Sequence, residues 1–256
     1  MLVTYTAQAT AELPTIDVLA IGAHPDDVEM NVGGTLLKLK AQGYRTGILD
    51  MTRGEMGTRG TVELRAIEAH NAAQILGLDV RANLELPDGH ISADDASRRK
   101  LVRALRRLRP KVIFAHYPED PHPDHAHSAQ IIREAAHLAH LAKYDTDFGL
   151  ERHFISAIAH YLFPRTVAPT FLVDITAHRE EKWAALAAHV SQFHNPNSQD
   201  LQTLLSGEDF FDRLKARDRY FGGLINVRDA EAFVVKEALN VADPMALLTQ
   251  PMNFYS

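Results

Sequence analysis

The sequence predicts an α/β fold in which a mostly parallel sheet carries helices on both faces. Three observations support this prediction. Over residues 17–117, short apolar segments of strand length alternate with longer segments of helical character. The resulting order, β-α-β-α-β-α-β, implies right-handed crossovers that place helices on both faces of a parallel sheet. The 256 residues contain no internal repeat, low-complexity segment or linker, so we expect a single domain over 1–256.

The first half of the chain contains the clearest elements. A leucine-rich helical segment, 32–43, follows Asn31, and Thr61 caps an amphipathic segment at 62–77. The glycine-rich segment 52–60 has no apolar period and is predicted to be a loop. Buried strands are predicted at 17–22 and 111–117, further strands at 44–51 and 83–86, and a further helix at 92–109.

The second half has a less regular pattern. A loop starting at residue 118 opens into a helix that ends at residue 142. Residues 231–238 are compatible with a strand or with a helix end, and residues 1–15 are expected to be a loose lead-in. The remaining predictions are strands at 157–163 and 170–175 and helices at 176–193 and 207–223.

Composition excludes several classes of protein. A net charge of −6 argues against a general nucleic-acid binder, which needs a positive surface to displace counterions from phosphates. No apolar run approaches the length of a membrane helix, and the N-terminus does not resemble a signal peptide, so a cytoplasmic location is favoured. Because cysteine is absent, a transition-metal site must use imidazole and carboxylate ligands, which suits a catalytic zinc.

Two clusters of histidine and aspartate follow predicted strands. The segment 24–27, His-Pro-Asp-Asp, follows the first strand, and 121–125, Pro-His-Pro-Asp-His, follows the fourth. Ligands of open parallel sheets bind at the carboxyl ends of the strands, so both clusters should meet at one edge. The loop 53–60, after the second strand, lies at the same edge. A single His-Pro-Asp tripeptide is also a plausible turn, but two of them at the same sheet edge favour a functional site.

A zinc ion with three protein ligands and an open fourth position fits this pattern. We predict His24, Asp27 and His125 as ligands, with His127 as the less favoured alternative to His125. Such an ion lowers the pKa of its water from about 16 toward about 7. Asp26, beside the ligands, is then the candidate general base.

His122 is the candidate for stabilising an oxyanion or protonating a leaving amine, with its tautomer held by Asp124 or another carboxylate. Three other features of the sequence do not indicate a further binding site. His137 and His140 fit an ordinary helix face, and the basic run over 98–109 fits a solvated face or an oligomer contact. The glycines of 54–60 do not have the spacing of a dinucleotide-binding fingerprint.

The motifs AHPDD, PHPDH and RGEMGTRGTVELRAIEA resemble those of the LmbE-like, or PIG-L-type, zinc N-acetylglucosamine deacetylases. The sequence looks most similar to the bacillithiol-biosynthesis branch, which deacetylates N-acetylglucosaminyl-malate. The segments RGEMGTRGTVELR, AAHVSQF (187–193) and RDRYFGGLI (217–225) support that narrower resemblance. The resemblance implies a Rossmann-like fold, a small-molecule amino-sugar substrate and a homo-oligomer, often a hexamer.

Carried over by motif, the family's zinc ligands fall on His24, Asp27 and His125. Its base falls on Asp26, and its charge-stabilising histidine falls on His122, oriented by Asp124. The resemblance also implies substrate-binding roles for three residues: Arg65, which would hold substrate near the metal, and Arg53 and Thr58, which would contact the sugar or its aglycone.

One segment departs from the pattern of the bacillithiol branch. The branch usually carries a glycine where this chain has Asn226, and Tyr-Ala-Glu-Gly-Phe where it has 229–233, Asp-Ala-Glu-Ala-Phe. This departure weakens the malate assignment but leaves the metal chemistry unchanged. Our leading hypothesis is a zinc-dependent deacetylase, with Fe(II) as an alternative metal. The rival hypotheses are a two-metal phosphoesterase and a non-catalytic protein that binds metal or sugar.

Overall fold

The computed structural model describes residues 14–195 and 198–249. Its centre is a five-stranded parallel sheet with the strand order β3-β2-β1-β4-β5, so the predicted fold class is confirmed. All the strands run parallel, but the direction in which successive strands are added to the sheet reverses at β1, because β2 and β4 flank it on opposite sides. The strands are β1 (Val18–Gly22), β2 (Thr46–Asp50), β3 (Val80–Asn83), β4 (Val112–His116) and β5 (Ala157–Tyr161).

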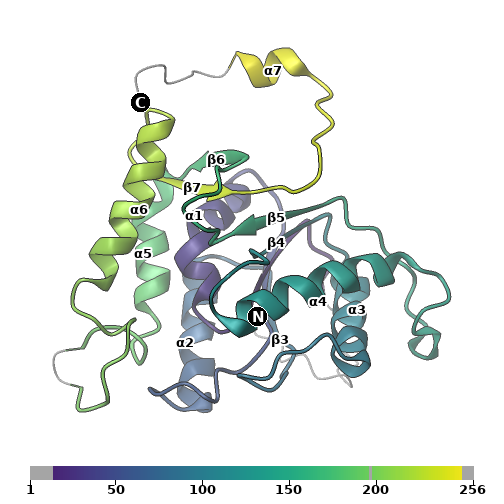
Figure 1. Cartoon of the computed structure of the whole chain (residues 1–256), viewed down its shortest axis with the longest axis horizontal. Helices are drawn as coiled ribbons and strands as arrows, with labels where there is room; N and C mark the ends of the chain where they lie inside the picture. Colours follow the sequence, from purple (N-terminus) through teal and green to yellow (C-terminus); the bar gives the residue numbers. More distant parts are fainter. Residues whose placement is uncertain (1–13, 196–197, 250–256) are drawn as a thin grey trace.

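Helices cover both faces of the sheet (Figure 1). Alternating residues of β1 show the two layers: Leu19 and Ile21 pack toward α3 and α4, whereas Val18 and Ala20 pack toward α1 and α2. Side chains of successive strand residues point to opposite faces, so one buried strand serves two cores. The helices are α1 (Asp27–Ala41), α2 (Val62–Ile75), α3 (Asp95–Leu108), α4 (Pro123–His140) and α5 (Arg179–Ala187).

The C-terminal part adds a small antiparallel sheet of β6 (Phe171–Asp174) and β7 (Ala230–Phe233). A bridge between His160 and Val234 connects it to β5. Helix α6 (Phe210–Leu224) packs on β7, and α7 (Pro244–Leu248) stands away from the body (Figure 1). Two short 3-10 turns, η1 (Thr146–Phe148) and η2 (Thr176–His178), complete the elements of the described residues.

Some predicted boundaries are wrong for identifiable reasons. The third strand runs over 80–83 rather than 83–86, because Leu84 and Leu86 are buried in the loop that follows it. Helix α1 begins at Asp27 rather than after Asn31, since its polar first turn is buried inside the molecule. The predicted helix 176–193 contains η2 and α5 but ends at Ala187. Helix α7 was not predicted.

The sequence of 231–238 is compatible with a strand or with a helix end. In the structure its first three residues belong to the strand β7. The expected lead-in, 1–15, lies outside the described residues except for its last two positions. Among the described helices, none combines the length and the apolar character that crossing a membrane requires.

The basic run over 98–109 is not simply the solvated face that the sequence favours, because several of its partly buried arginines bind groups within the molecule. Arg99 and Arg103 pair with the buried Asp145, with the Nε atom of Arg103 2.6 Å from a carboxylate oxygen. Arg106 is buried and donates to backbone carbonyls near the end of α4, those of Ala139, Leu141 and Tyr144. Much of the run therefore fastens α3 to α4 and the loop after it.

Candidate metal centre and active site

The turn after β1 carries the first cluster of predicted site residues. Asp26 is the N-cap of α1 and has φ of 119°, a conformation that costs a non-glycine residue about 1–3 kcal/mol. The turn is tight enough that the amide N–H of His24 donates to Oδ2 of Asp27 at 2.8 Å. The amide N–H of Thr52 donates to the carbonyl of Ala23, which joins this turn to the loop after β2.

His24, Asp27 and His125 come together as the sequence predicts. Each offers one ligand atom, and these atoms lie within 4.8 Å of one another. Nδ1 of His24 lies 3.4 Å from one carboxylate oxygen of Asp27, and Nε2 of His125 lies 3.4 Å from the other. Two imidazole nitrogens facing one carboxylate form the donor set of a three-ligand cation site, so these residues fit a zinc or similar ion.

The second nitrogen of each imidazole faces a carboxylate. Nε2 of His24 lies 3.1 Å from Asp88 Oδ1 and 3.4 Å from Asp124 Oδ2. Nδ1 of His125 lies 3.1 Å from Asp120 Oδ1. Such contacts fix the tautomer and ring orientation of metal-binding histidines. They leave Nδ1 of His24 and Nε2 of His125 as the atoms that face Asp27.

The electrostatics of this cluster favour positive charge. Burial lowers the pKa of His24, but hydrogen bonds to Asp124, Asp27 and Asp88 outweigh it and raise that pKa to about 12. Burial likewise lowers the pKa of His125, and the charge of Asp27 with the hydrogen bond to Asp120 raises it to about 9. The surrounding carboxylates therefore stabilise charge that either protons or a metal ion can supply.

Two other groups of potential ligands lie beside the predicted one: His116–Asp120–His125 and His24–Asp88–Asp124. Neither is a convincing second site. The rings of His116 and His125 stack with centroids 3.9 Å apart and planes 12° apart, so their lone pairs lie in nearly parallel planes and do not converge. Asp124 already accepts the amide N–H groups of Gly89 and Ile91.

Asp26 lies buried beside the ligands. Its carboxylate faces Arg65, with 3.5 Å between Oδ2 and Nη2. Burial raises the pKa of Asp26 to about 6, although the charge of Arg65 opposes that shift. A carboxyl group with a pKa near neutrality is suited to general-base chemistry.

His122 occupies the N-cap of α4 and is exposed, with its ring centroid 5.1 Å from that of His24 and 4.5 Å from that of His125. Burial and the neighbouring His125 and His24 lower its pKa. Among the described residues no hydrogen bond joins His122 to Asp124, whose carboxylate faces the loop amides and His24, so the orienting role of Asp124 stays a prediction. Asp120, which accepts the backbone N–H of His122, is the carboxylate next to it in the turn.

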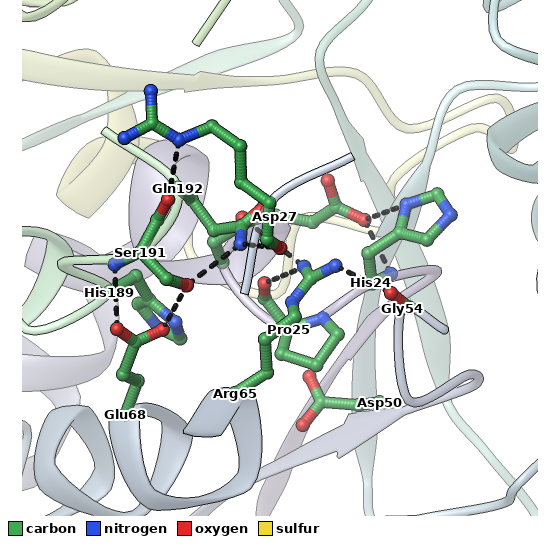
Figure 2. Close-up of polar contacts among 12 residues, drawn as sticks. His24, Pro25, Asp27, Asp50, Gly54, Arg65, Glu68, His189, Ser191 and Gln192 are labelled. Atoms are coloured by element: carbon green, nitrogen blue, oxygen red, sulfur yellow. Dashed lines mark hydrogen bonds and ion pairs between the residues drawn. The ribbon is translucent and has the colours of Figure 1, made fainter. Parts of the chain in front are cut away.

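The three predicted substrate-binding residues differ in exposure. Arg53 and Thr58 are exposed in the loop after β2, where a substrate can reach them. Arg65 is only 4% exposed and donates to the carbonyls of Pro25 and Gly54 (Figure 2). His127, the alternative ligand, is exposed and belongs to none of the three ligand groups of the described residues.

Three residues of this centre were not predicted. Asp88 and Asp120 hold the two histidines, and the buried His116 places Nε2 3.2 Å from Oδ2 of Asp27. Burial lowers the pKa of His116 to about 4, so the ring is neutral. Asp88 follows β3 at the same sheet edge, so the rule that parallel strands end at one edge could have found it.

The divergent segment lies outside this cluster. Asn226 has φ of 58°, a left-handed conformation that glycine and asparagine tolerate best. The carboxylate of Glu231 accepts the amide N–H groups of Gly34 and Thr35 in α1, at 2.9 and 2.7 Å. The retained glutamate therefore anchors β7 to the helix that begins at Asp27, one of the predicted metal ligands.

Comparison with known proteins decides the family. Residues 19–136 match the family described as PIG-L, GlcNAc-PI de-N-acetylase. Diacetylchitobiose deacetylase from Thermococcus kodakarensis is 34% identical over 189 residues, covering 69% of this chain and 70% of that protein. The chain belongs to the PIG-L family.

Solved structures with the same fold support the assignment to the PIG-L family. The conserved protein TT1542 from Thermus thermophilus has a TM-score of 0.79 and 41% identity, covering 89% of this chain and 98% of that one. The N,N'-diacetylchitobiose deacetylase from Pyrococcus horikoshii has a TM-score of 0.74 and 29% identity, covering 86% of this chain and 83% of that one. The predicted PIG-L membership is confirmed, and the narrower bacillithiol branch stays a prediction.

Proposed function

We propose that this protein is a metal-dependent hydrolase that removes the N-acetyl group from an N-acetylglucosamine conjugate. The observation that carries the proposal is the convergence of His24, Asp27 and His125 beside the buried carboxyl of Asp26. The kinship with diacetylchitobiose deacetylases supplies the substrate class.

The metal assigned to this site is zinc, one per chain, with Fe(II) as the alternative that histidine and carboxylate ligands also accept. His24, Asp27 and His125 would hold it. When bound, such an ion supplies Lewis-acid chemistry, which makes water more acidic and polarises a carbonyl group.

Asp26 is assigned as the general base. It takes a proton from the water molecule whose oxygen attacks the acetyl carbonyl carbon, and a new C–O bond forms as the carbonyl π-bond opens. His122 stabilises the resulting oxyanion through its exposed ring at the rim. When the C–N bond breaks, a proton from Asp26 or His122 passes to the departing nitrogen. The products are acetate and a free amine.

The finer assignments follow the sequence motifs. We propose N-acetylglucosaminyl-malate in bacillithiol biosynthesis as the substrate, with Arg53 and Thr58 contacting the sugar or its aglycone. We also propose a cytoplasmic homo-oligomer, a hexamer by family resemblance, with no nucleic-acid or membrane partner.

The decisive experiment measures acetate release from malate-linked, inositol-linked and free N-acetylglucosamine and from diacetylchitobiose, on protein of known metal content. We expect about one metal per chain and turnover of at least one conjugate. Asp26→Ala should retain the metal and lose activity, and full activity in that variant would contradict the mechanism. Two metals per chain with phosphoester cleavage would favour a phosphoesterase. Bound metal without acetate release from any conjugate would favour a non-catalytic binding protein.

A further inference from the structure

Helix α6 contacts the helix that begins at Asp27, one of the predicted metal ligands. From α6, Nη1 of Arg217 donates to Oδ1 of Asn31 at 2.7 Å, and Nη2 donates to the carbonyl of Met30 at 2.6 Å. Both acceptors lie near the start of α1. The motif RDRYFGGLI (217–225), which contains none of the predicted site residues, therefore begins with a side chain that binds α1.

Asn31 extends this contact to Asp27. The side chain of Asn31 is buried, and its Nδ2 atom donates to the carbonyl of Asp27 at 2.7 Å. The two ends of the amide are not interchangeable, because its oxygen must face the guanidinium, which only donates, and its nitrogen must face the carbonyl, which only accepts. Arg217 is thus two hydrogen bonds away from the backbone of a predicted metal ligand.

The guanidinium of Arg217 is itself held by a network of buried charges. Oδ1 of Asp218 accepts Nε–H and Nη2–H of Arg217, at 3.3 and 3.2 Å. The buried ammonium group of Lys182 binds Asp218 and lies 2.9 Å from Glu231. Alternating charges from α6, α5 and β7 therefore fix the fork that reaches α1.

The same network holds α1 one turn further along. Glu231 accepts the amide N–H groups of Gly34 and Thr35 at 2.9 and 2.7 Å. Arg217 thus binds an acceptor of the helix backbone, whereas Glu231 binds donors four residues later. Contacts of opposite polarity on successive turns oppose both sliding and rotation of α1.

Two glycines permit this close packing. A Cβ atom at Gly34 would lie 2.8 Å from side-chain atoms of Ile175, in the segment that leads from β6 into η2. A Cβ atom at Gly222 would lie 2.7 Å from the carbonyl oxygen of Arg228, two residues before β7. Because real Cβ atoms essentially never approach so closely, glycine is required at both positions for α1 and α6 to take their places.

The first turn of α1 needs external support. Its N-cap residue, Asp26, has the strained φ of 119° and makes no side-chain capping bond. Strained backbone persists only where the surroundings hold it. The amide N–H of Met30 donates to the carbonyl of Asp26 at 3.2 Å, so the residue whose carbonyl Arg217 binds also closes this turn.

We propose that Arg217 is a positioning residue, which acts through Asn31 and Met30 to fix the turn that carries Asp26 and Asp27. Its effect on metal binding rests on the proposed metal centre, and its effect on catalysis rests on the proposed deacetylation. Its effect on the mobility of the turn rests on neither.

The first test is a competition titration of zinc against a chelator in Arg217→Met, which keeps an unbranched apolar side chain but removes the donors. Zinc affinity should fall about tenfold, the lower end of the effect of replacing a residue that orients a ligand. Arg98→Met is the matched control, because Arg98 is also partly exposed, 32% against 26%, and pairs with Glu134 between α3 and α4. Unchanged affinity in Arg217→Met, or an equal fall in Arg98→Met, would overturn the proposal.

A double-mutant cycle tests the route through Asn31. Asn31→Leu removes the bonds to Arg217 and to the carbonyl of Asp27, and it should also lower zinc affinity by about tenfold or more. The double variant should lose clearly less than the product of the two single losses, since both substitutions break the same bond. Losses that simply multiply would contradict a route through Asn31.

Hydrogen exchange of the metal-free protein requires neither zinc nor substrate. Peptides covering residues 26–35 should exchange about tenfold faster in Arg217→Met than in the wild type, while peptides covering β2 change by less than about threefold. Unchanged exchange over 26–35, or an equal acceleration in β2, would refute the positioning role. Arg217→Lys, which keeps the charge but not the planar fork, should show the same pattern and serves if the methionine variant does not fold.

Kinetics on one N-acetylglucosamine conjugate at saturating zinc complete the test. A displaced base should lower kcat about tenfold in Arg217→Met, while KM stays within about twofold. A rise in KM of more than about tenfold with unchanged kcat would overturn the proposal, because it would identify Arg217 as a substrate contact. If the wild type hydrolyses no conjugate, only the proposed deacetylation fails, and zinc affinity and hydrogen exchange still decide the role of Arg217.

Discussion

The carboxylate of Asp120 contacts the ring of His125, with 3.1 Å between Oδ1 of Asp120 and Nδ1 of His125. Five residues separate them in the sequence, and the first turn of α4 brings them together. The contact leaves Nε2 of His125 directed at Asp27, 3.4 Å away. It also gives the ring one defined tautomer, which metal binding requires.

Replacing Asp120 by asparagine should therefore weaken metal binding by about 10- to 100-fold, since the ligand loses its charged partner but keeps its own nitrogen. The measurement is a competition titration of zinc against a chelator of known affinity. Glu119→Gln is the control, because Glu119 is exposed and pairs with Lys236 instead. Equal zinc affinity in both variants would show that Asp120 does not tune His125.

His122 should affect the reaction without affecting the metal. It lies at the exposed rim near His24 and His125 but is absent from the three ligand groups of the described residues. We expect His122→Ala to lower kcat by about 10²–10⁴-fold, the usual contribution of an oxyanion or proton-transfer group. Metal analysis and acetate release on the same preparation test this. Loss of the metal in His122→Ala would place the residue among the ligands.

Lys182 should be essential for stability. It is fully buried, and its ammonium group binds Asp218 in α6 and lies 2.9 Å from Glu231 in β7. Lys182→Met removes the fully buried cation between two buried carboxylates, of which Asp218 keeps only the partly exposed Arg217, at 3.2 Å, and this should cost about 3–5 kcal/mol of the free energy of unfolding. Urea unfolding measures this cost. Lys215→Met, which removes an exposed lysine 3.9 Å from Asp212, should change it by less than about 0.5 kcal/mol.

His160 should make folding sensitive to mild acid. Burial lowers its pKa, despite the bond from Nδ1–H to the carbonyl of His116. Below about pH 6.5 the unfolded chain binds a proton at this residue that the folded protein does not. Its contribution to the free energy of unfolding therefore falls as the pH drops through that value.

The test is urea unfolding at pH 7.5 and pH 5 in the wild type and in His160→Asn, whose amide can replace the Nδ1 donor. The loss of stability on acidification should be smaller in the variant. His137→Asn, at an exposed position on α4, should lose as much as the wild type. An identical loss in all three proteins would assign the acid sensitivity to other groups.

The local pattern of the sequence was sufficient for much of this fold. The apolar runs of β1, β2 and β4 are buried on both faces, and that pattern of central parallel strands predicted them. The strand β3 was misplaced because Arg81, which would normally indicate a surface, is buried between Glu29 and Asp50. An ion cluster formed by three distant segments leaves no signal in any one of them.

The candidate site divides in the same way. The residues that share a short motif, His24 with Asp27 and His122 with His125, were predicted from spacing and from the rule that parallel strands end at one edge. Their partners were not: Asp88 for His24, Asp120 for His125 and His116 for Asp27. The assignment of Asp124 to His122 stays a prediction, because the carboxylate of Asp124 accepts amides of the loop after β3 in this structure.

The sequence by itself therefore determined the class of fold, the family and the three residues that gather as a group able to hold a metal ion. Those depend on periodicity and on short motifs, which are local properties of the chain. The tertiary structure alone decided which carboxylate orients which histidine, and that Arg65 is buried with its guanidinium on the carbonyls of Pro25 and Gly54. Such contacts join residues 5 to 89 positions apart, and the packing of the loops at the sheet edge sets them.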